Sequence, residues 1–246
     1  NETYRAMMDE GFTQFLTAWS LIKLDGEIYK PYQKDFNNIF LNKYQHRLKA
    51  LDIKAYLGYL DAAIQREDPQ LNTHSSDFSG GGIRHSGGYR QVYTKTAVML
   101  YNLQYVLGDS LFLTAMQHYV KKWKFAHPYP NDFRKAVIEH VGTDLNWFFD
   151  QWMETSKVID YSVEKVKHLD KDTFLIRFER KGEMQMPIDF EVLTYKGNKI
   201  KYHIPNTWFI KKTDATILEK WHAWGKIFPN YKTQVKIPSG IKNIII

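Results

Sequence analysis

Metal chemistry is the first possibility to weigh, because the sequence holds nine histidines and no cysteine. The lack of cysteine excludes disulfides and thiolate metal sites, so any metal must take nitrogen and oxygen ligands. Two imidazoles that share one zinc ion from a single helix stand four residues apart, on the same helix face. No histidine of this chain has a second histidine at that spacing. An autonomous zinc site of this type is therefore excluded.

The remaining polar candidates are a pair of acids, a tyrosine and the end of a glycine-rich stretch. Alone, Asp9 and Glu10 are typical of exposed acids on a helix, and Tyr93 is typical of an aromatic residue that packs on a core. Ahead of Tyr93, the run Gly80-Gly81-Gly82 lacks the Gly-Lys-Ser/Thr of a phosphate-binding loop. These glycines belong to a Ser-, Gly-, Thr- and Asn-rich stretch at 72–88, and loops of this length inside compact domains are usually functional or disordered.

The composition is that of a globular chain with few classes of partner. Its 246 residues are 43% hydrophobic, enough for a core in one large or two modest domains. Basic residues are interleaved with acidic ones despite a net charge of +7, so we expect a solvated basic surface and no nucleic-acid partner. No stretch reaches the roughly 20 apolar residues of a membrane span, and we expect no transmembrane segment. The compartment stays open; a leader ahead of Asn1 would indicate a periplasmic or secreted protein.

The first part of the chain has the three-to-four spacing of apolar residues that predicts helices. The Asp25-Gly26 and Gly108 positions are expected stops, and Asn131 and Thr143-Asp144 are expected helix caps. The expected helices are residues 3–24, 32–48, 53–64, 93–107, 110–123, 131–142 and 144–152, with a loop at 72–88.

After about Val158 the pattern changes to the alternation of β-strands. We expect strands at residues 173–179, 186–194, 199–204, 231–237 and 242–246, with a hairpin turn at 196–198. The chain is therefore expected to be α+β with two domains, a helical one at 1–157 and an antiparallel β-sandwich at 158–246.

Several segments resemble the aminopeptidase N family of zinc metallopeptidases, which are gluzincins. Arg5-Ala-Met-Met-Asp-Glu-Gly-Phe12 is similar to the family's Trp-Leu-Asn/Asp-Glu-Gly-Phe/Ala, and residues 92–100, Val-Tyr-Thr-Lys-Thr-Ala-Val-Met-Leu, resemble its Val-Tyr-Glu-Lys-Gly-Ala segment. Residues 144–152 are similar to the family's closing helices, and residues 177–188 to its sandwich domain. Thr94 and Thr96 depart from the family, which has an acid and a glycine there.

The resemblance implies a fold and roles for named residues. Residues 1–157 would be the helical C-terminal lobe of a thermolysin-like catalytic domain, and the sandwich would be immunoglobulin-like. Glu10 falls on the position of the third zinc ligand, and Tyr93 on that of the tyrosine that stabilises the oxyanion. Apart from the resemblance, the position of Arg84 and His85 just ahead of Tyr93 suits contact with a peptide substrate, and the alternative is that both are simply exposed to solvent. The family's His-Glu-x-x-His is absent and would precede residue 1.

These expectations make the chain a fragment of an enzyme that removes N-terminal residues from peptides, with zinc as the cofactor of the intact protein. Its partners would be the peptide and the missing N-terminal part, and the chain alone is expected to be inactive and not to bind zinc tightly. One alternative is a non-catalytic scaffold that retains the fold. Another is a carbohydrate- or protein-binding sandwich that uses Trp208, Trp221 and Trp224.

Overall fold

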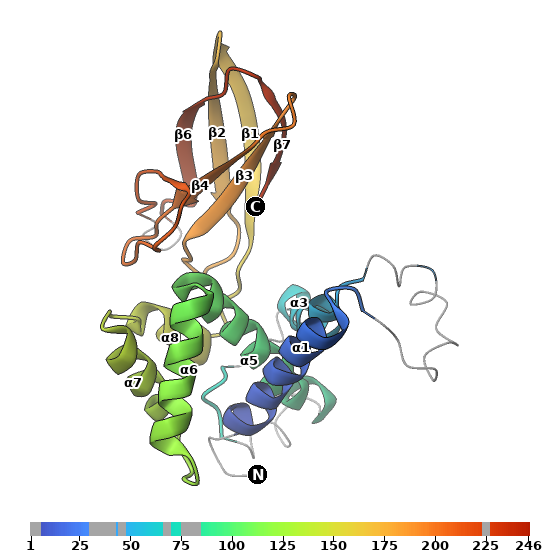
Figure 1. Cartoon of the computed structure of the whole chain (residues 1–246), viewed down its shortest axis with the longest axis vertical. Coiled ribbons are helices and arrows are strands. Elements are labelled where there is room, and N and C mark those ends of the chain that lie inside the picture. Colours follow the sequence, from blue (N-terminus) through green and yellow to red (C-terminus); the bar gives the residue numbers. More distant parts are fainter. Residues whose placement is uncertain (1–5, 30–42, 44–47, 66–69, 75–84, 223–226) are drawn as a thin grey trace. The chain divides into compact units, whose positions relative to one another are not determined.

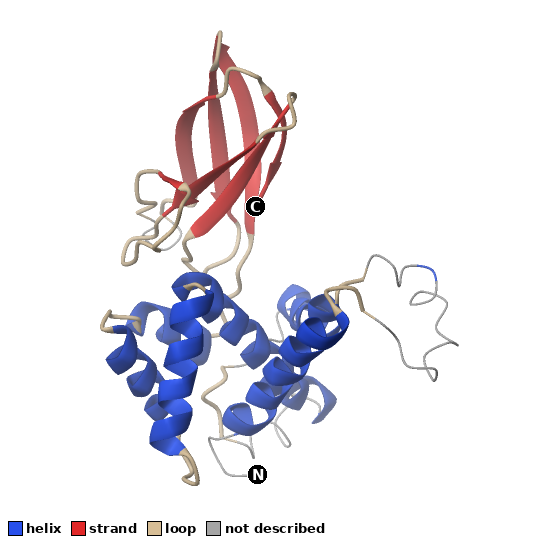
Figure 2. Cartoon of the chain, viewed as in Figure 1, coloured by secondary structure: helices blue, strands red, loops and turns tan. Residues whose placement is uncertain are grey.

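The computed structural model describes residues 6–29, 43, 48–65, 70–74, 85–222 and 227–246, with the side chains of 85–91 left out. The chain forms two compact units, Asn1–Ser156 and Lys157–Ile246. Within the described residues, the helices lie in the first unit and the strands of the sheets in the second (Figure 2). The expected α+β class, with helices followed by a sandwich, is confirmed.

The helical unit is built around one long helix. Its elements are η2 (Met7–Gly11), α1 (Phe12–Asp25), η4 (Asp52–Tyr56), α3 (Leu57–Gln65), α5 (His85–Leu107), α6 (Asp109–Trp123), α7 (Pro130–Val141) and α8 (Asn146–Met153). The central helix α5 packs against α1, α3 and α6, while α7 packs on the far side of α6 (Figure 1). From Val92 to Leu100 the side chains of α5 are buried, apart from that of Tyr93.

The helix ends agree with the sequence in most places, but the starts of α5 and α7 differ. Gly26, Gly108 and Gly142 have positive φ and end or separate helices as expected. However, α5 begins at His85 rather than at 93, so the end of the expected loop, residues 85–88, is helical; residues 75–84 lie outside the described set. Helix α7 begins at Pro130 with Tyr129 as its N-cap, not Asn131, because Pro suits the first helical position. The expected helix at 32–48 falls mostly outside the described residues.

The second unit holds two small sheets. The strands are β1 (Tyr161–Asp170), β2 (Thr173–Arg180), β3 (Ile188–Thr194), β4 (Lys199–Ile204), β5 (Thr216–Ile217), β6 (Asn230–Lys236) and β7 (Ile241–Ile245). The sheet orders are β1-β2-β6 and β5-β4-β3-β7, and every pairing is antiparallel except the short β4–β5 pair. The expected turn at 196–198 is present, with Gly197 at φ 84°.

The sequence missed β1 and β5 for physical reasons. Strand β1 is half-buried at its start and exposed over its last seven residues, so its polar sequence lacks a clear apolar alternation. Strand β5 has only two residues. The core between the sheets is apolar and largely aromatic, and Trp221, 5% exposed, stacks on Tyr231 within it.

Candidate active site

Glu10 lies in a π-helical turn. The five residues of η2 are helical with one residue more per hydrogen-bonded turn than an α-helix, and such turns occur frequently at functional sites. Asp9 is exposed, while Glu10 is half-buried. The expectation for an isolated pair of surface acids therefore holds for Asp9 but not for Glu10.

Aromatic contacts fix the chain directly after this turn. The ring of Phe12 lies 4.9 Å from that of Phe133 in an edge-on contact and 5.9 Å from that of Tyr119. Burial raises the pKa of Tyr119 to about 12, with a further contribution from the carboxylate of Asp132. Tyr119 therefore stays neutral in this cluster at ordinary pH. The start of α1 is thus anchored on α6 and α7, and the turn of Glu10 with it.

Gly11 brings the turn of Glu10 into direct contact with α5. A Cβ atom added to Gly11 would lie 2.2 Å from Cβ and 2.7 Å from Oγ1 of Thr96, closer than any side chain tolerates. Only glycine allows this approach. Because α5 turns by about 100° per residue, Thr96 lies about 60° around the helix from Tyr93 and one turn along it. The structure therefore packs the turn that carries Glu10 beside the turn that carries Tyr93.

A second glycine contact holds the other flank of Tyr93. A Cβ atom added to Gly58 of α3 would lie 2.6 Å from Cγ2 of Thr94. Both threonines are buried, whereas Tyr93 between them is half-buried. The two positions that depart from the family pattern are thus positions at which glycines of neighbouring helices closely approach α5.

Lys95 is held on the opposite side of α5. Its side chain is 0% exposed, and its Nζ donates a hydrogen bond to the carbonyl oxygen of Thr155 at 3.0 Å. Thr155 in turn donates its hydroxyl to the carbonyl of Gln151 at 2.6 Å. The sequence predicted no role for Lys95, although its place between two threonines, directly before the apolar run at 97–100, is an unusual position for a charged residue.

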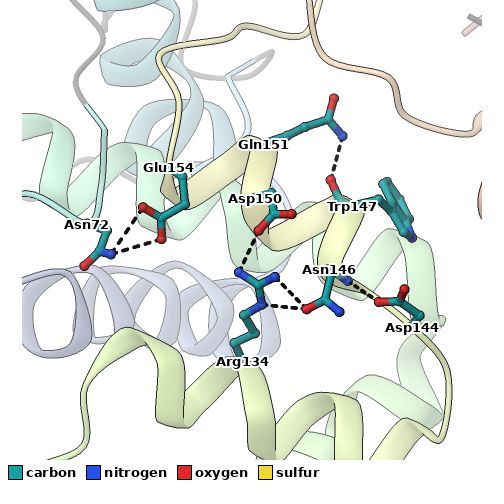
Figure 3. A network of polar contacts seen from close by, with 8 residues as sticks. All are labelled: Asn72, Arg134, Asp144, Asn146, Trp147, Asp150, Gln151 and Glu154. Carbon is teal, nitrogen blue, oxygen red and sulfur yellow. Dashed lines mark hydrogen bonds and ion pairs between the residues drawn. The ribbon is translucent and has the colours of Figure 1, made fainter. Parts of the chain in front are cut away.

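The C-terminal part of α8 is the centre of a wider polar network (Figure 3). Asn72 donates through Nδ2 to the carboxylate of Glu154 at 3.0 Å and through its backbone N–H to Met153 O at 3.0 Å. Arg134 of α7 binds Asp150 at 2.7 Å and Asn146 through two hydrogen bonds. These contacts fix α8, to which both Lys95 and the segment at 70–74 are attached.

The structure does not describe the side chains of the two residues expected to contact the substrate. Arg84 lies outside the described residues, and the side chain of His85, the first residue of α5, is not described either. Within the described residues, no group of three or more His, Asp or Glu side chains could hold a metal ion. The same residues include no helix that is both long and apolar enough to cross a bilayer.

The proposed tryptophan platform on the sandwich is not formed by all three residues. Trp221 belongs to the core, where it also contacts Tyr161 at 5.5 Å between ring centroids. Trp208 is 51% exposed, and Trp224 lies outside the described residues. The aromatic character of this unit is therefore explained in large part by its core.

Comparisons with known proteins agree with the resemblance seen in the sequence. Residues 88–152, which include Tyr93, match the Peptidase family M1 domain, whereas Glu10 precedes the matched range. The fold is similar to that of aminopeptidase A from Legionella pneumophila in complex with aspartic acid, with a TM-score of 0.54, 14% identity and 96% of this chain covered. This chain spans only 22% of that protein. No curated protein matches the sequence.

Proposed function

We propose that this chain is part of a zinc-dependent metallopeptidase of the aminopeptidase type, in which Glu10 is the third zinc ligand and Tyr93 stabilises the oxyanion. The observation that carries the proposal is the packing of Gly11 on Thr96, since it sets the turn of Glu10 beside that of Tyr93. The family match over residues 88–152, which include Tyr93 but not Glu10, independently supports the peptidase part of the proposal. The domains are the helical lobe at 1–157 and the sandwich at 158–246.

The zinc site would be completed by groups outside this chain. Glu10 suits one ligand position, because it is a half-buried carboxylate in a turn fixed by Gly11 and Phe12. Among the described residues, no group of three or more ligating side chains could hold the ion, and in this proposal the two imidazoles would come from outside the chain. Zinc, when bound, polarises the scissile carbonyl as a Lewis acid.

Tyr93 acts on the carbonyl oxygen as a hydrogen-bond donor. A phenol remains protonated at neutral pH and can donate to the oxygen as negative charge develops on it. The contacts of Gly11 with Thr96 and of Gly58 with Thr94 fix the turn of α5 that carries Tyr93, which reduces the freedom that must be lost to align the hydroxyl. The substrate would be the N-terminal residue of a peptide, with Arg84 and His85 as contacts for it.

The decisive experiment replaces Tyr93 by phenylalanine in the intact protein and measures hydrolysis of aminoacyl-p-nitroanilides and of peptides with free or acetylated N-termini. Loss of one oxyanion donor costs about 10²- to 10³-fold in kcat, so we expect a decrease of that size with little change in KM. Acetylated peptides should not be cleaved by either protein. Unaltered turnover by Tyr93→Phe would remove the role assigned to Tyr93.

Tyr101→Phe is the matched control, since it removes a hydroxyl from the same helix. The Tyr101 hydroxyl is buried and has no hydrogen-bond partner among the described residues, and burial raises its pKa. Its loss should leave kcat and KM unchanged. If both variants lose activity equally, the effect reflects the helix rather than the oxyanion.

A further inference from the structure

Lys95 is a charged residue placed where a charge is unfavourable. Its side chain is fully buried, and burial of an ammonium group away from water opposes folding unless the group is well paired. The side chain reaches from α5 to the carbonyl of Thr155, just beyond the C-terminus of α8. The negative end of a helix dipole favours a cation at such a position.

The contacts around Lys95 complete a three-point attachment of α5. Lys95 lies about 160° around the helix from Tyr93, so it cannot contact the same ligand. The flanks of Tyr93 are held by Gly11 and Gly58 through the two threonines, and those contacts resist displacement of α5 toward η2 and α3. The hydrogen bond of Lys95 resists displacement and rotation on the remaining side.

The receiving end of this attachment is itself rigid. Gln151 donates to the carbonyl of Trp147 at 2.8 Å and accepts from the hydroxyl of Thr155, so Thr155 is tied to the last turn of α8. Arg134 joins α8 to α7 through Asp150 and Asn146 (Figure 3). The carbonyl that binds Lys95 is therefore not part of a free loop.

We infer that Lys95 is a positioning residue for Tyr93: by binding the carbonyl of Thr155 it fixes the rotation of α5 and aims the tyrosine hydroxyl. This inference rests on the proposed function. It extends that function by giving Lys95, which is buried on the face of α5 away from the reaction, the role of aligning the hydroxyl of Tyr93.

The kinetic test combines Lys95→Met with Tyr93→Phe in the intact protein. Methionine is of similar length but cannot donate to Thr155, and we expect kcat to fall at least tenfold with KM within about twofold. Because Lys95 acts through the tyrosine hydroxyl, Lys95→Met should cause no further loss in a Tyr93→Phe background. Losses that multiply, or a change confined to KM, would overturn the inference. Lys135→Met, at an exposed position of α7, is the charge-matched control and should have no effect.

A second test needs no peptidase activity and is made on this chain. Since the chain has no cysteine, Lys95→Cys can be alkylated with bromoethylamine in denaturant to give a thioether analogue of lysine, then refolded. We expect the amides of residues 92–97 to exchange hydrogen at least tenfold faster in Lys95→Cys and to regain protection after alkylation.

The two tests separate the inference from the proposed function. Normal turnover of Tyr93→Phe together with restored protection after alkylation would overturn the catalytic proposal and the assigned purpose of Lys95, while the attachment itself would stand. Exchange at residues 92–97 that is the same in the wild type and Lys95→Cys would overturn the attachment. If Lys95→Cys does not fold, failure of the alkylated protein to regain its fold would also overturn the attachment.

Discussion

Glycines on neighbouring elements make room for Thr94 and Thr96, which stand where the similar family has an acid and a glycine. Each threonine faces a glycine on a neighbouring element, Gly58 and Gly11 respectively, at less than normal side-chain separation. In this chain Gly11, in the turn of Glu10, therefore leaves space into which the side chain of Thr96 packs. Such close-packed contacts tolerate added volume poorly.

Gly11→Ala tests this packing in the present chain. The new methyl group cannot coexist with Thr96 without a shift of η2 or α5, so we expect a loss of about 1–3 kcal/mol in the free energy of unfolding. Urea denaturation followed by circular dichroism measures it. In a Thr96→Gly background the added methyl group has room, and its cost should fall by at least about 1 kcal/mol.

Gly58→Ala provides the control for that comparison. Gly58 contacts Thr94 and not Thr96, so the cost of Gly58→Ala should be the same with threonine or glycine at position 96. If Gly11→Ala were equally costly in both backgrounds, the contact between Gly11 and Thr96 would not be the cause.

At the residue scale, the sequence predicted roles for Glu10 and Tyr93 and none for Lys95. Gly11 must be small because its backbone approaches Thr96 closely, and a glycine within a helix is a local signal of such an approach. The burial of Lys95 depends on a carbonyl 60 residues later in the chain, and no local pattern contains that information.

At the scale of elements, the positions of strands and helices followed from the sequence wherever an element has one buried and one exposed face. Strand β3 alternates buried and half-buried residues along its length and was predicted, whereas the exposed end of β1 was not. The π-helical form of η2 was also not predicted, because it adds one residue to a turn without changing the apolar pattern.

A partly buried polar cluster attaches the segment after β4 to the second sheet. Asp189 of β3 binds Nδ1 of His203 and Nζ of Lys211, both at 2.6 Å. The backbone N–H of Lys211 donates to Nε2 of His203 at 3.4 Å, which makes Nδ1 the protonated nitrogen. Desolvation opposes ionisation of Asp189, but the hydrogen bonds from His203 and Lys211 outweigh it and lower the pKa of Asp189.

Asp189→Asn should therefore destabilise the sandwich. Loss of hydrogen bonds to a charged group, discounted because Asp189 is 34% exposed, leads us to expect about 1–2 kcal/mol at pH 7 in urea denaturation. Asp214→Asn, at an 86% exposed position, should change stability by less than about 0.5 kcal/mol.

The pH dependence of the same variant has a definite sign. Because the folded pKa of Asp189 lies below its unfolded value, near about 3.9, the stabilisation is present above that pH and is lost as pH falls through the folded pKa. The difference in stability between wild type and Asp189→Asn should therefore narrow below about pH 4. A gap that widens with acid would contradict the assigned ionisation.

At the scale of the whole molecule, the helical unit contains both residues assigned to the reaction but supplies only one expected metal ligand. The whole chain spans 22% of the similar aminopeptidase, and no cluster of three ligating residues occurs among the residues described. Binding of a structural or catalytic metal depends on the joint action of several ligands. The proposed zinc site therefore requires ligands in addition to Glu10.

Zinc binding tests that dependence. In the intact protein we expect Glu10→Gln to lower the metal content, measured by atomic emission after dialysis, from near one zinc per chain to less than about one fifth, since the amide is a weak ligand. Asp9→Asn, at the exposed neighbouring position, should retain the metal. The present chain alone should bind no stoichiometric zinc in equilibrium dialysis, because a single carboxylate cannot replace three ligands. Tight zinc on this chain that disappears with Glu10→Gln would show instead that the site is complete without the missing part.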